Sequence, residues 1–198
     1  MDHKILQIPL KEEEIRALNI GDVVYLSGTI YTARDMAHLR LRELAEGGSP
    51  VPFALEGGAI FHAGPVALRG EDGSWRLSVI GPTTSIRMEP HADFVGRLGV
   101  RAVIGKGGMG PDTLAACQKY GYVYLQAAPG CAALLARGIR SIKSVTWLDL
   151  GMPEAVWELE AECFGPLVVG MDSKGNSLYA NIRAKALERI DTLYPLAL

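Results

Sequence analysis

The sequence predicts an α/β fold with a mixed, partly parallel sheet. The middle of the chain alternates short apolar runs with segments of helical periodicity, and glycines fall where one element should end and the next begin. Strands that alternate with helices of about ten residues are typical of parallel pairing, whereas the first third of the chain is richer in strand signals. The chain has 198 residues, 48% of them hydrophobic, so we expect one domain over residues 1–198 with a sizeable core.

Within the first eighty residues, the first predicted strand is Val23–Ser27, and a loop is expected to follow it at Gly28–Tyr31. From Thr32 to about Glu46 the apolar residues follow helical spacing, with Thr32 and Asp35 as a capping pair and two glycines as the stop. Further strands are expected at Ala59–His62, Pro65–Leu68 and Leu77–Ile80.

Beyond residue 82 the pattern alternates between helix and strand. Helices are expected at His91–Leu98, Pro111–Tyr120 and Cys131–Arg137. The strands between and after them are expected at Arg101–Ile104, Tyr122–Gln126 and Ser141–Thr146. The last segments are predicted to be a helix at Glu154–Phe164, a strand at Leu167–Met171, a turn over residues 172–176 and a strand at Ser177–Asn181.

Composition and charge narrow the possible functions. Twenty basic residues stand against 22 acidic ones, so the chain has no overall field that would steer it onto nucleic acid or an anionic membrane. The N-terminal segment has three consecutive glutamates and no apolar core, and no apolar run reaches the length of a membrane span, so we expect neither a signal peptide nor a membrane helix. These features predict a cytoplasmic protein whose basic residues act locally, in a site.

The three cysteines predict no disulfide framework. Cys117, Cys131 and Cys163 lie far apart without a C-x-x-C spacing, and their odd number does not suit a secreted protein. We interpret them as small buried apolar residues in a reducing compartment. The alternative, an iron–sulfur cluster held by these three residues, finds no histidine at metal-ligand spacing to support it. We therefore expect no metal site in this chain alone.

The first candidate site loop carries Arg34, Asp35 and His38 at the start of the predicted helix after residue 32. The helix dipole disfavours a cation in the first turn by about 0.3–1 kcal/mol, and Asp35 offsets only part of this cost. An anion that docks at the helix N-terminus would explain Arg34, because such termini attract anions. The alternative is an ion pair between Arg34 and a surface carboxylate.

The second candidate loop, GPTTSIRM, places hydroxyl groups directly after a buried strand. Thr83, Thr84 and Ser85 follow a Gly-Pro kink, and Arg87 comes two residues later. In α/β sheets, ligands collect outside the carboxyl ends of the strands, which favours a binding site here. The alternative is that the hydroxyl groups only cap the next helix.

The third candidate loop places Lys106 among glycines, in the string IGKGGMG. Glycine allows the backbone to approach a ligand closely. The order G-x-x-x-x-G-K-(S/T) of a phosphate loop is absent, which excludes nucleotide binding of that type. The alternative is a flexible glycine turn with a solvated lysine. Taken together, the three loops predict half of a site for a small dicarboxylate, because two carboxylates are best held by arginine forks and a lysine point charge.

The strings SGTIYTARDMAHLR, GPTTSIRM, IGKGGM and LGMPEAVWELE resemble the β subunit, or C-terminal domain, of class I fumarate hydratases and the related L-tartrate dehydratases. The similarity covers nearly the whole chain in the family's order. It implies a swivelling β/β/α domain with three layers and a mixed, partly parallel sheet. It also implies a hydro-lyase that is active only as a hetero-oligomer with an α subunit, which holds a [4Fe-4S] cluster with one iron free to act as a Lewis acid.

The resemblance also implies roles for individual residues. Arg34, Arg87 and Lys106 would bind the substrate carboxylates, and Thr83 would transfer the proton at the substrate carbon. Supporting positions would be Asp35, His38 and Thr84. The implied reaction is the reversible hydration of fumarate to L-malate. The alternatives are dehydration of L(+)-tartrate, which these motifs do not separate from fumarate hydration, and a small-anion-binding domain of the same fold without catalysis.

Overall fold

The computed structural model describes residues 3–193, with side chains described to residue 190. In this range the strands are β1 (His3–Gln7), β2 (Val23–Thr32), β3 (Ala59–Phe61), β4 (Val66–Arg69), β5 (Trp75–Val79), β6 (Ala102–Gly105), β7 (Val123–Ala127), β8 (Ile139–Thr146) and β9 (Val156–Met171). The α-helices are α1 (Glu12–Arg16), α2 (Asp35–Glu46), α3 (Ala92–Arg97), α4 (Pro111–Tyr120), α5 (Ala132–Arg137) and α6 (Leu178–Leu193), and the 3₁₀ helices are η1 (Ser85–His91) and η2 (Leu148–Leu150).

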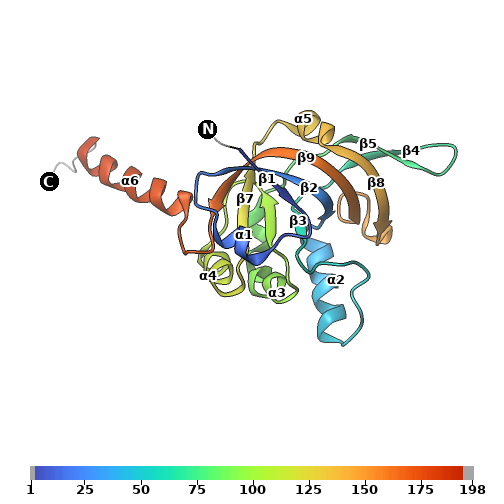
Figure 1. The fold of residues 1–198 in the computed structure, drawn as a ribbon, viewed down its shortest axis with the longest axis horizontal. Coiled ribbons are helices and arrows are strands. Elements are labelled where there is room, and N and C mark those ends of the chain that lie inside the picture. Colours follow the sequence, from blue (N-terminus) through green and yellow to red (C-terminus); the bar gives the residue numbers. More distant parts are fainter. Residues whose placement is uncertain (1–2, 194–198) are drawn as a thin grey trace.

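A mixed sheet curls until two of its strands meet. The order of its strands within residues 3–193 is β1-β2-β3-β6-β7-β9-β8, and β9 also pairs with β2, so β2, β3, β6, β7 and β9 close into a barrel-like sheet (Figure 1). Strands β2, β3, β6 and β7 are parallel neighbours, whereas β9 runs antiparallel to β2, β7 and β8. The carboxyl ends of β2, β3 and β6 therefore lie at one edge, where ligands of α/β sheets collect.

Helices cover the outside of this sheet. Figure 1 shows α2, α3 and α4 on one side of the strands and α5 on the other, while the β4–β5 hairpin extends beyond the body. One apolar cluster fills the barrel and includes Phe61, Trp157 and Phe164. A second cluster lies between the sheet and α2, α3 and α4, and it includes Leu41, Phe94 and Tyr122. The α/β class and the mixed sheet that the sequence predicts are both present.

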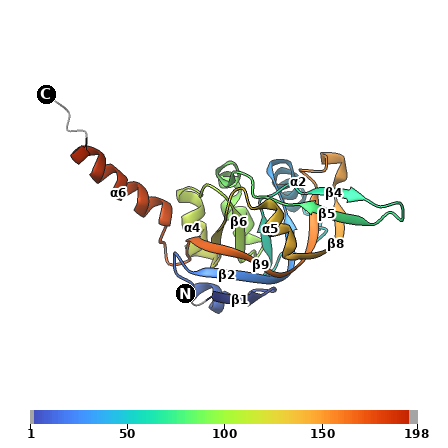
Figure 2. The same cartoon turned by 90° about the horizontal axis from the view of Figure 1, so that it is seen from above.

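The last helix leaves the body of the molecule. α6 projects outward in two perpendicular views (Figures 1 and 2). Its large apolar side chains Ile182, Leu187 and Ile190 are exposed. In the described part of the chain, no helix combines the length and the apolar character needed to cross a membrane.

Several predicted elements agree with the structure. The helix predicted at Pro111–Tyr120 is α4, and the helix predicted from about Thr32 is α2, which begins later, at Asp35. The predicted loop at Gly28–Tyr31 is wrong, because β2 continues to Thr32. Gly28, at φ +110°, lies where the pairing of β2 with β9 changes register, and a Cβ there would lie 2.8 Å from a backbone oxygen of Ile8. This close approach explains the glycine without a turn.

The predicted capping pair of Thr32 and Asp35 does not form. Thr32 is fully buried, its hydroxyl donates to the carbonyl of Ala155, and its oxygen accepts the N–H of Trp157 at 3.0 Å. Arg34 occupies the N-cap position instead, with an extended backbone. The hydroxyl of Thr32 thus joins β2 to the start of β9.

Two predictions near the end of the chain are also wrong. Glu154–Phe164 is not a helix, because Val156–Met171 forms β9. Trp157, Leu159 and Ala161 alternate toward the barrel interior with a period of two, although alanine and glutamate in this segment favour helix locally. The predicted strand at Ser177–Asn181 is the beginning of α6, and Ser177 keeps only one isolated bridge, to Met171.

Candidate anion-binding site

The first two candidate loops meet through Arg87. Its Nη2 lies 3.0 Å from the carboxylate of Asp35, at the start of α2, and donates to the hydroxyl of Thr83 at 3.0 Å. Arg87 belongs to η1, so the loop after β5 and the loop after β2 lie side by side. The side chain of Arg87 is 45% exposed, which leaves it accessible to a ligand.

The second and third loops meet through their backbones. Thr84 forms a parallel bridge with Lys106, and the N–H of Ser85 donates to the carbonyl of Lys106 at 3.0 Å. The N–H of Thr83 donates to the carbonyl of His62, the residue after β3, at 2.7 Å. These contacts bring the three loops together at the carboxyl ends of β2, β3 and β6.

Arg34 has a carboxylate partner that the sequence did not indicate. Its Nε lies 3.2 Å from Glu154, in the turn before β9, without the geometry of a hydrogen bond. The other oxygen of Glu154 accepts the N–H of Met36 at 3.0 Å, which fixes Glu154 at the beginning of α2. The ion pair confirms the alternative interpretation of Arg34, while its role in binding an anion stays a prediction. Glu154 lies within the string LGMPEAVWELE, the only sequence signal that could have identified it.

Lys106 differs from both arginines. Its side chain is partly exposed and makes no hydrogen bond or ion pair with any residue that the structure describes. Arg34 faces Glu154 and Arg87 faces Asp35, so the three cations outnumber the two carboxylates beside them. The arrangement thus keeps a net positive charge, carried by Lys106, which suits an anionic ligand.

Three histidines lie under these loops. The ring centroid of His38 is 5.3 Å from that of His62 and 5.2 Å from that of His91, and all three side chains are buried. Burial lowers the pKa of His38 to about 4 and also lowers the pKa values of His62 and His91. All three histidines are therefore neutral near pH 7, and their contacts support the backbone of the loops.

The histidine contacts show what this support consists of. His38 Nδ1 lies 2.8 Å from the carbonyl oxygen of Arg34. A carbonyl can only accept, so Nδ1 carries the proton. His62 Nδ1 lies 3.0 Å from the hydroxyl of Ser85. His38, expected as a supporting residue, thus holds the backbone of Arg34, while His62 and Ser85 join β3 to the second loop.

The described residues offer no ligand set for a metal ion: no group of three or more His, Cys, Asp or Glu side chains among residues 3–190 is arranged to hold one. Cys117 is buried in α4, Cys131 is partly buried and Cys163 is exposed on β9. Burial raises the pKa of the Cys117 thiol, which disfavours the thiolate that a metal requires. These contacts give no support to the alternative of a cluster held by this chain.

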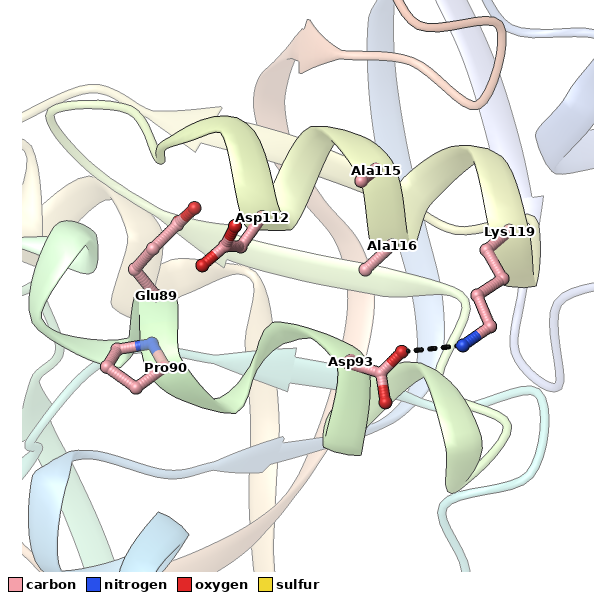
Figure 3. A pocket seen from close by; sticks show the side chains of 7 residues that line it. All are labelled: Glu89, Pro90, Asp93, Asp112, Ala115, Ala116 and Lys119. Atoms are coloured by element: carbon pink, nitrogen blue, oxygen red, sulfur yellow. Dashed lines mark hydrogen bonds and ion pairs between the residues drawn. The ribbon is translucent and has the colours of Figure 1, made fainter.

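A separate pocket of about 370 Å³ lies between α3 and α4 (Figure 3). Glu89, Asp93 and Asp112 line it together with Lys119, whose ammonium pairs with Asp93 at 2.9 Å. Its acidic lining does not suit a dicarboxylate. Glu89 also accepts the N–H groups of Gly110 and Thr113, at 2.7 and 2.9 Å, and so holds the start of α4.

The predicted cations lie on a partly exposed surface. The side chain of Arg34 is 23% exposed and that of Arg87 is 45% exposed, while Lys106 is partly exposed. Exposed apolar side chains flank them, namely Met36 and Leu39 on α2 and Ile86 on η1, each close to half exposed. A partly exposed cationic surface with an apolar rim is suited to be covered by another molecule.

Comparisons with known proteins identify related chains. The family described as Fumarase C-terminus matches residues 2–182. The protein named "Putative L(+)-tartrate dehydratase subunit beta" of Methanocaldococcus jannaschii is 47% identical over 189 residues, which cover 94% of this chain and 96% of the relative. The "L(+)-tartrate dehydratase subunit beta" of Escherichia coli is 44% identical over 191 residues, 96% of this chain and 93% of the relative. The "Putative fumarate hydratase class I" of Geobacillus stearothermophilus is 46% identical over 186 residues, which cover 93% of this chain but 35% of that protein.

Proposed function

The chain belongs to the Fumarase C-terminus family, and on that premise we propose that it is the β subunit of a hydro-lyase that reversibly hydrates fumarate to L-malate. One observation carries this proposal. The loops that carry Arg34, Arg87 and Lys106 meet beside the ends of parallel strands, although they are far apart in the sequence, and Arg87 there donates to the hydroxyl of Thr83. The two carboxylates of a small dianion are best held by several cations, close to the group that transfers the proton.

L(+)-tartrate is the second candidate substrate. Two relatives that match this chain over more than nine-tenths of their own length are named "Putative L(+)-tartrate dehydratase subunit beta" and "L(+)-tartrate dehydratase subunit beta". The relative named for fumarate is about three times longer than the matched region. Because both reactions remove or add water next to a carboxylate, the same cations serve either substrate.

The proposed partner is an α subunit that carries a [4Fe-4S] cluster. The described residues of this chain do not fit such a cluster, since the cysteines are dispersed and no ligand group is formed among residues 3–190. The partly exposed cationic surface and its apolar rim support a site that the partner completes. We also propose that residues 1–198 form one swivelling β/β/α domain with three layers, because β2 and β9, from opposite ends of the chain, close the same barrel.

Arg34, Arg87 and Lys106 are proposed to bind the substrate carboxylates. Arginine offers a planar fork to a carboxylate, and Lys106 adds a point charge that no described side chain neutralises. Once the partner excludes water, each charge acts more strongly on the negative charge that develops on a carboxylate during the reaction.

Thr83 is proposed to move the proton at the substrate carbon. A threonine hydroxyl is a poor base without help. Arg87 donates to this hydroxyl oxygen, and a cation there favours the negative charge left when the hydroxyl proton departs. The carboxylate of Asp35, 3.0 Å from the same Nη2, helps to hold the guanidinium beside Thr83.

Co-expression of this chain with its α subunit, under anaerobic conditions, tests the proposed function. We expect the pair to consume fumarate or L(+)-tartrate, while neither chain alone does so. The preferred substrate then decides between the two hydro-lyase candidates. Full activity of this chain alone, or failure to associate with a cluster protein, would exclude the β-subunit assignment and favour a small-anion-binding domain without catalysis. A brown colour and charge-transfer absorption in this chain alone, after anaerobic reconstitution, would indicate a cluster of its own.

A further inference from the structure

The position of the Lys106 ammonium depends on the backbone that carries it. No described residue pairs with this side chain, so the conformation of residues 105–108 decides where the charge lies. Gly107 and Gly108 have φ angles of +81° and +79°. Two adjacent glycines give the segment many accessible conformations unless neighbouring groups restrict it.

One side of this segment is fixed by the second loop. The carbonyl of Lys106 accepts the N–H of Ser85 at 3.0 Å, and Ser85 is fully buried. A Cβ at Gly105 would lie 1.7 Å from the hydroxyl oxygen of Ser85, so the two residues are in direct contact. These contacts hold the residues before and at Lys106, but they do not hold Gly108.

The other side is covered by an aromatic ring from α6. A Cβ at Gly108 would lie 2.8 Å from Cγ of Tyr179, and a Cβ at Gly170, on β9, would lie 2.9 Å from Cε2 of the same ring. The ring of Tyr179 therefore occupies the space that side chains at both glycines would fill. Its hydroxyl donates to the side-chain oxygen of Gln126, at the end of β7.

The turn before α6 fixes the place of this ring. The buried carboxylate of Asp172 accepts the N–H groups of Lys174 and Asn176, at 3.0 and 2.9 Å, and the N–H of Ile20 at 3.3 Å. The N–H of Ala180 is capped by the hydroxyl of Ser177 at 3.3 Å. The first turn of α6 is thus attached to the barrel, although the rest of the helix projects away from it (Figure 2).

We infer that Tyr179 is a positioning residue for Lys106: its ring, held over Gly108 and Gly170 by the root of α6, restricts the glycine segment so that the ammonium stays in the site. This inference rests on the proposed function, because Lys106 matters to turnover only if it binds substrate. The contacts of Tyr179 are with Gly108, Gly170, Gln126 and Tyr124, so it acts on Lys106 through the backbone of the glycine segment.

A double-mutant cycle in the assembled enzyme tests this inference. Tyr179→Ala should lower kcat/KM by about tenfold or more, since a misplacement of about 1 Å can cost up to 10²-fold. Tyr179→Phe keeps the ring and should stay within about threefold of the original enzyme. In a Lys106→Ala background, Tyr179→Ala should cause no further loss, because coupled residues are not additive. Independent, additive losses would overturn the inference, as would equal losses for Phe and Ala.

The matched control is Tyr25→Ala. The ring of Tyr25 also lies over a glycine, Gly165, where a Cβ would be 2.9 Å from Cδ1, and it stacks edge-on against His3. This variant removes the same kind of contact from β2 and should leave kcat/KM unchanged. A loss equal to that of Tyr179→Ala would show that any such cavity impairs the enzyme, and would overturn the specific role of Tyr179.

Hydrogen exchange of the full chain separates this inference from the proposed function. Tyr179→Ala should accelerate exchange of the amides at residues 105–110 while the amides of β8 keep their protection, whereas global destabilisation would accelerate both. Unchanged exchange at residues 105–110 would overturn the inference. If Lys106→Ala leaves turnover intact while exchange behaves as expected, the role of Lys106 in catalysis fails, and the packing role of Tyr179 stands.

Discussion

Arg87 donates from Nη2 to the hydroxyl oxygen of Thr83 over 3.0 Å. The same nitrogen lies 3.0 Å from the carboxylate of Asp35, which is the first residue of α2. The guanidinium of Arg87 thus contacts both a hydroxyl and a carboxylate, and so joins the two loops. This arrangement provides the neighbouring cation that a threonine needs in order to transfer a proton.

Thr83→Ala should lower kcat on the order of 10²-fold or more and change KM much less, because the hydroxyl acts in proton transfer and the cations bind the substrate. Steady-state kinetics of the assembled enzyme measures both quantities. Thr83→Ser keeps the hydroxyl and should retain much of the activity. A rise in KM with unchanged kcat would reduce Thr83 to a binding residue.

Arg87→Ala should reduce kcat/KM by about 10²–10³-fold, which corresponds to about 3–4 kcal/mol of transition-state stabilisation. The thermal unfolding midpoint should hardly change, because Arg87 is 45% exposed and its ion pair with Asp35 is solvated. The matched control is Arg97→Ala, since Arg97 is also exposed and paired with an aspartate, Asp93, at 3.2 Å. Near-normal turnover of Arg87→Ala would contradict the proposed carboxylate-binding role.

Lys106→Ala should reduce turnover strongly without loss of folding, because its ammonium makes no ion pair or hydrogen bond within residues 3–190. Loss of a preorganised charge of this kind costs on the order of 10²-fold or more. Lys119→Ala is the control, since Lys119 lies in the acidic pocket and pairs with Asp93. Equal kinetics for both variants would remove Lys106 from the site.

The free energy of unfolding should fall between about pH 6.5 and pH 4. An unfolded histidine has a pKa of about 6.5. Burial lowers the pKa of folded His38 to about 4, so in this window the unfolded chain binds a proton that the folded chain does not. Stability from His38 is therefore present above pH 6.5 and lost as the pH falls, by roughly 2 kcal/mol at pH 5.

Urea denaturation at pH 7 and pH 5 measures this effect. His38→Gln removes the titrating group and should lose less stability between the two pH values than the original chain, while His62 and His91 keep their contributions. An identical pH dependence in both chains would contradict the assignment to His38.

Local sequence was sufficient where an element depends on its own residues. Pro111 at the first position and Gly121 with φ +67° after the last turn mark the ends of α4, and the predicted boundaries agree with the structure. The first part of β9 was missed because its residues favour helix locally, while its pairing with β2 and β8 decides the outcome; the last part, Leu167–Met171, was predicted as a strand. The start of α6 was missed because the turn at Asp172 resembles the loop of a hairpin.

The sequence alone determined which chemical groups follow the predicted strands, namely Arg34, Thr83, Arg87 and Lys106. Only the tertiary structure decided how these groups are paired. Glu154 reaches the start of α2 across 118 positions of the chain, and Tyr179 reaches Gly108 from the last helix. The physical reason is that local propensity acts over a few residues, whereas ion pairs and ring contacts depend on the closure of the barrel, which brings distant segments together.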